Sequence, residues 1–130
     1  MASPVPNLWS RAVGEQFVVT PRSILKQQAG FLGEKTKYMV TASVDTTADP
    51  KHGFRHGFVL EANALGGYHF ELFALRHADR DFYPIKVVSD ATDSGTTRIH
   101  SEEELLAFLK TALGSEKTTQ VVNTLLSQMV

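Results

Sequence analysis

The residues best suited to chemistry in this sequence are its five histidines, two of which, His56 and His77, fall on two predicted neighbouring strands. A Gly66-Gly67 pair separates these strands and fits a two-residue turn, because both central residues of a type I′ turn need positive φ. With that turn, His56 lies opposite His77 at the far end of the hairpin. We call this end of the sheet the pole, and we expect it to gather His52, Arg55, His56, Arg76, His77, Asp79, Arg80 and Asp81.

Several chemistries are open at the pole. Two histidines and a carboxylate such as Asp79 can bind a divalent metal, or can share the acid and base roles of phosphodiester hydrolysis. The arginines at positions 55, 76 and 80 can instead hold a phosphate or carboxylate of a ligand or partner. The simplest interpretation is a solvated loop end, since loops are polar as a rule. The spacing depends on an inferred turn, so it predicts no metal and no cofactor.

The sequence lacks the motifs of common enzymes. It has no phosphate-binding loop, no dinucleotide-binding glycine pattern, no H-E-x-x-H helix and no G-x-S-x-G elbow. It has no cysteine, which excludes disulfide scaffolds, thiol catalysis and iron–sulfur clusters. The 13 basic and 14 acidic residues give a formal net charge of −1, so non-specific binding to nucleic acid is not expected. A non-enzymatic role is therefore the more favoured one.

The first residues lack the basic and apolar parts of a signal peptide, and no apolar stretch reaches the ~20 residues of a membrane span. A cytoplasmic location without a membrane partner is therefore the expectation.

The predicted hairpin register assigns each side chain to a face of the sheet. One face carries the four large apolar residues Phe58, Leu60, Phe73 and Leu75, in line with the two histidines. The other face carries Val59, Glu61, Asn63, Phe70, Leu72 and Ala74. A sheet in water needs only one apolar face, so two such faces predict cover on both sides. The cover is either the chain's own helices or a second chain.

Local signals mark the remaining elements. Thr20 and Pro21 suit the N-cap and first position of a helix, with Gly33 placed to end it in a left-handed turn. Ser101 and Glu104 form a capping-box pattern ahead of a second helix, and Ser115 starts a third. Residues 37–45 alternate as a strand, followed by a loop over residues 46–55. Residues 82–88, or the part after Pro84, form another strand, and residues 96–100 offer a short last one.

These elements predict one α+β domain over residues 1–130, with an antiparallel meander of four or five strands, one N-terminal helix and two C-terminal helices. The pattern leaves open whether residues 1–19 are ordered. Their apolar side chains, Trp9 among them, are expected to pack on the body of the domain.

The function favoured by this pattern is a non-enzymatic protein-binding domain of adaptor type. We expect it to self-associate as a homodimer and to hold a protein partner through an apolar sheet face and the pole. The expected binding residues are Arg55, His56, Phe58, Leu60, Phe73, Leu75, Arg76, His77 and Arg80. Two alternatives stay open: a small hydrolase or nuclease that uses His56, His77 and Asp79, and a binder of a small phosphate-containing ligand.

Overall fold

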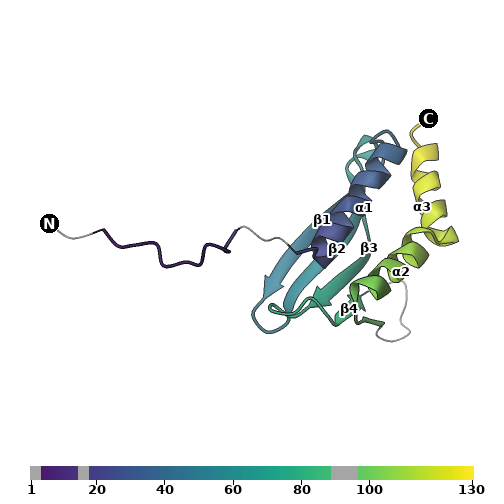
Figure 1. The fold of residues 1–130 in the computed structure, drawn as a ribbon. Helices are drawn as coiled ribbons and strands as arrows, with labels where there is room; N and C mark the ends of the chain where they lie inside the picture. The colour runs from purple at the N-terminus through teal and green to yellow at the C-terminus, as the bar shows by residue number, and fades with distance from the viewer. Residues whose placement is uncertain (1–3, 15–17, 89–96) are drawn as a thin grey trace.

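A computed structural model describes residues 4–14, 18–88 and 97–130 of the chain. Within these residues, a helix is followed by a run of strands and then by two further helices (Figure 1). The elements are α1 (Pro21–Lys35), β1 (Thr41–Asp49), β2 (Gly53–Ala62), the 3₁₀ turn η1 (Asn63–Leu65), β3 (Tyr68–His77), β4 (Ile85–Val88), β5 (Arg98–Ile99), α2 (Glu102–Leu113) and α3 (Glu116–Ser127).

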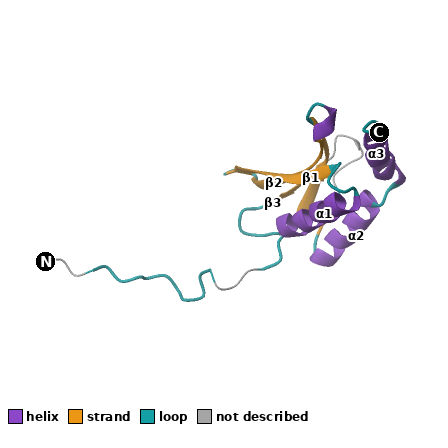
Figure 2. Ribbon diagram, turned by 90° about the horizontal axis from the view of Figure 1, so that it is seen from above, coloured by secondary structure: helices purple, strands orange, loops and turns teal. Residues whose placement is uncertain are grey.

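The strands form one open sheet in the order β1-β2-β3-β4-β5, and every neighbouring pair is antiparallel. The three helices lie together on one side of this sheet, as the view from above shows (Figure 2). The predicted α+β meander with one N-terminal and two C-terminal helices is therefore confirmed. The other side of the sheet carries no helix of the described chain and is called the open face below.

The predicted helix starts are also confirmed. The Thr20 side chain accepts a hydrogen bond from the backbone N–H of Ser23, with Pro21 at the first helical position. Ser101 caps α2 by accepting from Glu104, and Ser115 caps α3 by accepting from Thr118. Each cap satisfies a backbone N–H that the first helical turn leaves without a partner.

The chain between α1 and β1 differs from the prediction. Helix α1 continues past Gly33 to Lys35, and the chain then reverses through Lys37 and Tyr38, which both have positive φ. Strand β1 consequently begins at Thr41 instead of residue 37. Gly33 does not end the helix. A Cβ atom there would lie 3.0 Å from the Tyr38 ring, so the glycine leaves room for that side chain.

The predicted long loop over residues 46–55 is wrong as well. Strand β1 runs on to Asp49 and β2 begins at Gly53, so only residues 50–52 form the turn. The polar residues of this stretch stay in the ladder because each has a partner, as in the pair Thr46 and His56.

The β2–β3 hairpin closes with a longer connection than the predicted turn. Residues 63–65 form η1, and Gly66 and Gly67 follow with φ of 70° and 77°. Phe58 therefore pairs with Phe73 and not with Leu75, a shift of two residues. The register changes again between Phe58 and Val59, a β-bulge at which Leu72 has no partner across the ladder.

The bulge decides which face is apolar. Leu72 and its neighbour Phe73 both pack toward the helices, and Phe70 lines a hollow beneath α2 and α3. The predicted second apolar face is thus wrong. The open face instead carries many polar residues, among them Ser43, Asp45, Arg55, Glu61, His69, Glu71, Arg76, Lys86 and Arg98.

The core lies between the helix-bearing face of the sheet and the helices. The four large residues expected to bind a partner, Phe58, Leu60, Phe73 and Leu75, are only 0–4% exposed there. They form one cluster with Leu25 of α1 and Leu105 of α2 among others. The chain's own helices therefore supply the cover for this face.

The N-terminal residues 4–14 extend away from this body (Figure 1). Leu8, Trp9 and Val13 are all exposed, Trp9 to 78%. The expected packing of these side chains on the domain is therefore wrong for the described structure. Among the described residues, no helix is both long and apolar enough to cross a membrane.

Candidate functional site

His56 and His77 meet at the pole, with their Nε2 atoms 2.8 Å apart. They are diagonal neighbours, because His56 pairs with Leu75 and His77 pairs with Phe54. The prediction that the two histidines pair directly across the hairpin is therefore wrong by two residues. A register shift of two residues keeps both side chains on the same face of the sheet. The two rings consequently still touch.

The contact belongs to a chain of hydrogen bonds that runs in one direction. The Ala78 carbonyl can only accept, so His77 Nδ1, 2.8 Å away, carries the proton and its Nε2 accepts from His56. His56 Nδ1 then accepts from the Thr46 hydroxyl at 2.9 Å, and that oxygen accepts from Arg22 Nε of α1 at 3.0 Å. We call this chain the histidine relay. It is complete when both imidazoles are neutral.

Burial favours the neutral form of His56. His56 is 4% exposed and His77 is 6% exposed. Burial lowers the pKa of His56 to about 4, with smaller contributions from the nearby His77 and Arg22 charges. Every ring nitrogen of the pair is already engaged in the relay. Neither histidine thus offers a free nitrogen to a substrate, and within the described chain no group of three or more metal-ligating side chains gathers.

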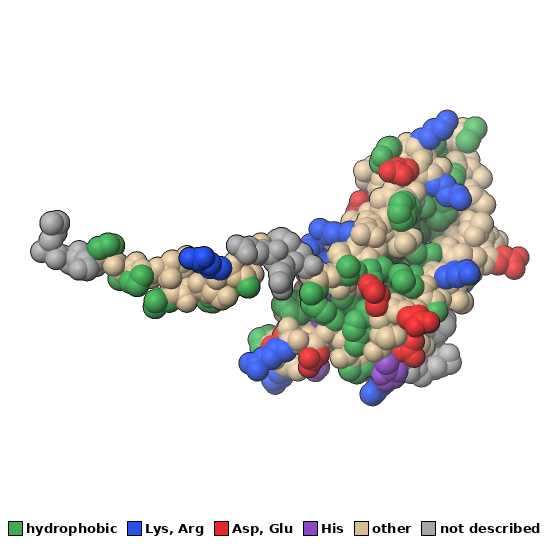
Figure 3. All heavy atoms as spheres, viewed as in Figure 1, with side chains coloured by type: hydrophobic (Ala, Val, Ile, Leu, Met, Phe, Trp, Pro, Cys, Tyr) green, Lys and Arg blue, Asp and Glu red, His purple; other side chains and the backbone are tan. Residues whose placement is uncertain are grey.

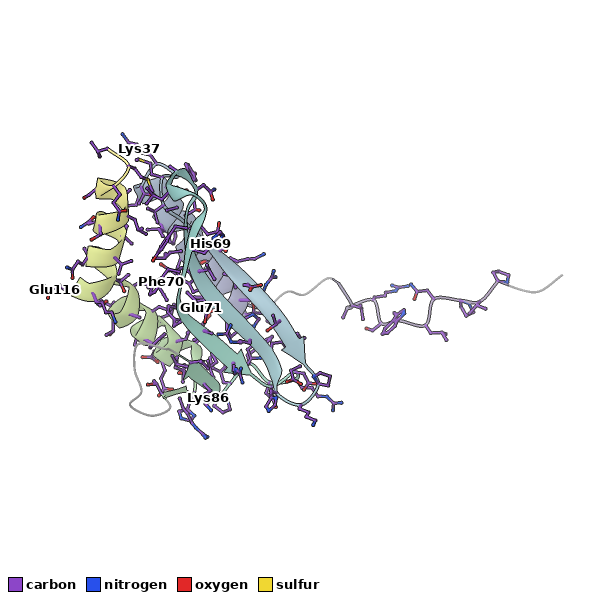
Figure 4. All side chains as sticks on the ribbon, turned by 180° about the vertical axis from the view of Figure 1, so that it is seen from behind. Lys37, His69, Phe70, Glu71, Lys86 and Glu116 are labelled. Atoms are coloured by element: carbon purple, nitrogen blue, oxygen red, sulfur yellow. The ribbon has the colours of Figure 1, made fainter. Side chains whose placement is uncertain are left out.

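On the open face, four basic side chains stand in direct cross-strand register. Arg55 of β2 pairs with Arg76 of β3, Arg76 pairs with Lys86 of β4, and Lys86 pairs with Arg98 of β5. We call these four residues the cationic row. Directly paired residues share a face with Cβ atoms roughly 5 Å apart. Figure 4 views the sheet from the open side and labels Lys86.

Arg55 has an intramolecular counter-charge. Its two terminal nitrogens lie 3.2 and 2.5 Å from the two carboxylate oxygens of Glu71 on β3. Gly57 makes room for this pair, since a Cβ atom there would lie 2.9 Å from Glu71 Oε2. Glu61 accepts a hydrogen bond from Ser43 at 2.8 Å and lies 3.8 Å from His69. In the described part of the chain, Arg76, Lys86 and Arg98 have no ion pair within 4.0 Å.

A polar hollow of about 310 Å³ adjoins the cationic row at the pole. Arg76 and Lys86 belong to both features. The residues that line the hollow are Pro50, Lys51, His52, Gly53, Arg76, His77, Ala78, Asp79 and Lys86. The Nε atom of Arg76 is buried and has no hydrogen-bond partner among the described residues.

A larger, apolar hollow of about 470 Å³ lies on the helix-bearing side, lined by Leu60, Leu72 and Val122 among others. Hydrophobic side chains also reach the surface on this side (Figure 3).

The structure brings together only part of the predicted site. Arg76, His77 and Asp79 line the polar hollow, whereas Arg80 does not and Arg55 lies in the cationic row. Sequence reasoning did not single out Lys51, Lys86 and Arg98 as site residues. The one available signal was the alternation of Lys86 between the apolar Ile85 and Val87, which places it on the polar face of its strand.

Comparison with known proteins gives no lead on function. No protein-family model, no curated protein and no solved structure matches this chain.

Proposed function

We propose that this protein is a non-enzymatic protein-binding domain of adaptor type whose cationic row binds an acidic segment of a partner protein. The observation that carries the proposal is the direct register of Arg55, Arg76, Lys86 and Arg98 across neighbouring strands of the open face.

Like charges placed directly opposite each other across a sheet are unfavourable. The Glu71 carboxylate offsets this repulsion at Arg55. In the described chain the three other cations of the row have no ion pair within 4.0 Å, and Asp49 acts on Arg76 only from a longer distance, so a bound anion would stabilise them. The row is therefore more favourable when an anionic ligand is bound than when the domain is free.

The size of the row favours a peptide segment. Three strand spacings of about 4.8 Å give a row about 14 Å long, which matches about four residues of extended chain. Alternate side chains of such a segment point to the same side, so two or three carboxylates can reach the row together. The formal net charge of −1 gives no general attraction for nucleic acid, which favours an acidic protein segment over a polynucleotide.

We do not propose self-association through an apolar sheet face. The residues expected to form that surface are buried beneath the chain's own helices. We do not propose catalysis by His56 and His77 either, because both rings are buried and hydrogen-bonded at both nitrogens. The cytoplasmic location stays a prediction, which cell fractionation would test.

The test uses a fluorescein-labelled peptide of eight residues with glutamate at alternate positions, and measures its affinity by fluorescence anisotropy at low salt. Lys86→Glu should weaken binding about tenfold or more, because it replaces a central cation of the row with an anion. Lys110→Glu is the matched control, since it makes the same change at an exposed position on α2. It should leave the affinity unchanged.

Equal affinities for the wild type, Lys86→Glu and Lys110→Glu would overturn the proposal, as would a complete lack of peptide binding. Tighter binding of a single-stranded oligonucleotide than of the peptide would overturn it in favour of a nucleic-acid ligand.

A further inference from the structure

The polar hollow beside the cationic row has walls from three separate elements. Lys51 comes from the β1–β2 turn, Arg76 comes from β3 and Lys86 comes from β4. Among the described residues, Asp79 is the one carboxylate that lines the hollow, and Asp49 beside it interacts electrostatically with Arg76. Three permanent cations against these two carboxylates leave a local excess of positive charge, which suits an anionic ligand group.

The wall formed by the β1–β2 turn is held in place by Asp49. One carboxylate oxygen of Asp49 accepts from the backbone N–H of Lys51 at 2.8 Å, and the other lies 2.7 Å from His52 Nδ1. Gly53 then brings the turn against the end of β3. A Cβ atom at Gly53 would lie 2.2 Å from the His77 carbonyl oxygen, so the two walls are in close backbone contact.

The opposite wall is held by the histidine relay. His77 lines the hollow, and both of its ring nitrogens are fixed, one by His56 and one by the Ala78 carbonyl. The hollow is therefore shaped before any ligand arrives. A site whose groups are already positioned loses less conformational entropy on binding.

Arg76 combines a buried donor with a side chain that reaches the hollow. Its Nε is buried and has no acceptor in the described part of the chain. Buried donors without a partner are rare in folded proteins and unfavourable. The Arg76 side chain also lines the hollow, so a group seated there would bond to the accessible part of its guanidinium and not to the buried Nε.

We propose that the polar hollow seats the phosphoryl group of a phosphorylated side chain that lies within the acidic segment bound by the cationic row. This inference rests on the proposed function and names the class of its partner. A phosphoryl group carries a charge of about −1.5 to −2 and three acceptor oxygens, which fits a hollow with cations on three walls. A carboxylate has one charge and two oxygens, and it suits the open row better. Arg76 and Lys86 join the two sites, since they belong to both.

The test compares two peptides of the same sequence, which has glutamate at alternate positions and a serine at one end. The serine is free in one peptide and phosphorylated in the other. A second pair with the serine at the other end covers both chain directions. The wild-type protein should bind the phosphorylated form of one pair about tenfold more tightly, as expected for a few new charge-assisted hydrogen bonds.

The variants separate the hollow from the row. Lys51→Ala should reduce the preference for the phosphorylated peptide, because it removes one of the three cations of the hollow, and should leave the affinity for the free serine form unchanged, because Lys51 lies outside the row. Arg98→Glu should weaken both forms by the same factor, because Arg98 lies in the row and outside the hollow. Lys37→Ala is the control at the opposite end of the sheet from Lys86 and should change neither affinity (Figure 4).

Equal affinities of the wild type for both forms of both peptides would overturn the phosphoryl site and leave the proposed function standing. A preference that Lys51→Ala leaves undiminished would overturn it too. If neither form binds, the proposed function itself fails. Displacement of the phosphorylated peptide by a more tightly bound single-stranded oligonucleotide would overturn both proposals.

Discussion

A neutral imidazole has one donor and one acceptor nitrogen, so two histidines in series can continue a hydrogen-bond chain in one direction only. In the relay, one extra proton can be accommodated if His56 changes tautomer and donates to Thr46, which has lone pairs to accept from both His56 and Arg22. A second proton would place two N–H groups face to face across the 2.8 Å between the Nε2 atoms. The contact between the two rings therefore opposes the uptake of a second proton.

The burial of His56 predicts that the stability of the protein depends on pH. Its pKa is about 4 in the folded protein, against about 6.5 in the unfolded chain. The unfolded state takes up the proton first, so the free energy of unfolding should fall as the pH drops from about 6.5 toward 4. Between pH 7 and pH 5 the loss should be about 2 kcal/mol, measured by urea unfolding.

The comparison that isolates this effect is His56→Gln, which keeps a donor toward His77 and an acceptor toward Thr46 but cannot titrate. Its stability should decline less than that of the wild type over the same pH range. Parallel pH profiles for the two proteins would contradict the assignment.

Two glycines near the pole give a second prediction at the residue scale. Gly53 has a φ of 81°, and a Cβ atom there would meet the His77 backbone. Gly53→Ala should therefore lower the free energy of unfolding by about 3 kcal/mol or more. The Cβ of Gly57→Ala would meet only the ends of the flexible Glu71 and Arg55 side chains, so that change should cost less than about 1 kcal/mol.

Thermal and urea unfolding of these two variants provide the measurement. Similar losses of stability in both variants would show that the close approach of Gly53 to β3 is not a real constraint.

At the scale of elements, helix starts could be predicted because their signals are local. Ser101 caps α2 within four residues of sequence, and α2 carries Leu105 and Leu109 into the core. Ser101→Ala should destabilise the protein by about 1 kcal/mol in urea unfolding. Ser127→Ala is the control, because the Ser127 hydroxyl donates to the Asn123 carbonyl at the exposed C-terminal end of α3. Its loss should lower the free energy of unfolding by only a few tenths of a kcal/mol. Equal costs would mean that the cap contributes nothing.

The strand register could be predicted only in part. Gly66 and Gly67 do take positive φ, but after η1 and not as a two-residue turn, and nothing local distinguishes these connections. Leu72 has no local signal for a bulge, because an apolar residue suits either face of a strand. The predicted contact between His56 and His77 is nevertheless present, because the register error at that end of the hairpin is two residues and keeps both side chains on the same face.

The cationic row lies beyond sequence reasoning for a related reason. It depends on how β4 and β5 pair with β3, and the segments between these strands carry no turn signal that fixes a register. Arg55 and Arg76 could be placed at the pole from their own hairpin. Lys86 and Arg98 could join them only once the sheet order was known.

At the scale of the whole molecule, a formal net charge of −1 conceals an uneven distribution. Four cations stand in one row across the open face, while the carboxylate of Glu61 lies on the same face away from that row and that of Glu71 contacts the row at Arg55. Because salt screens exposed charges over about 8–10 Å, the row acts on a docked segment and has little reach beyond it. Selectivity must therefore come from contact and not from long-range attraction.

The same distribution gives an expectation for the state of the free protein. The apolar face of the sheet is covered by α1, α2 and α3, and the open face repels a second copy of itself, row against row. We therefore expect a monomer of 14.3 kDa by size-exclusion chromatography with light scattering. The exposed Leu8, Trp9 and Val13 of the N-terminal segment are the main alternative contact. A dimer that persists after all three are changed to alanine would contradict this view of the surface, because the self-association would then involve the folded body.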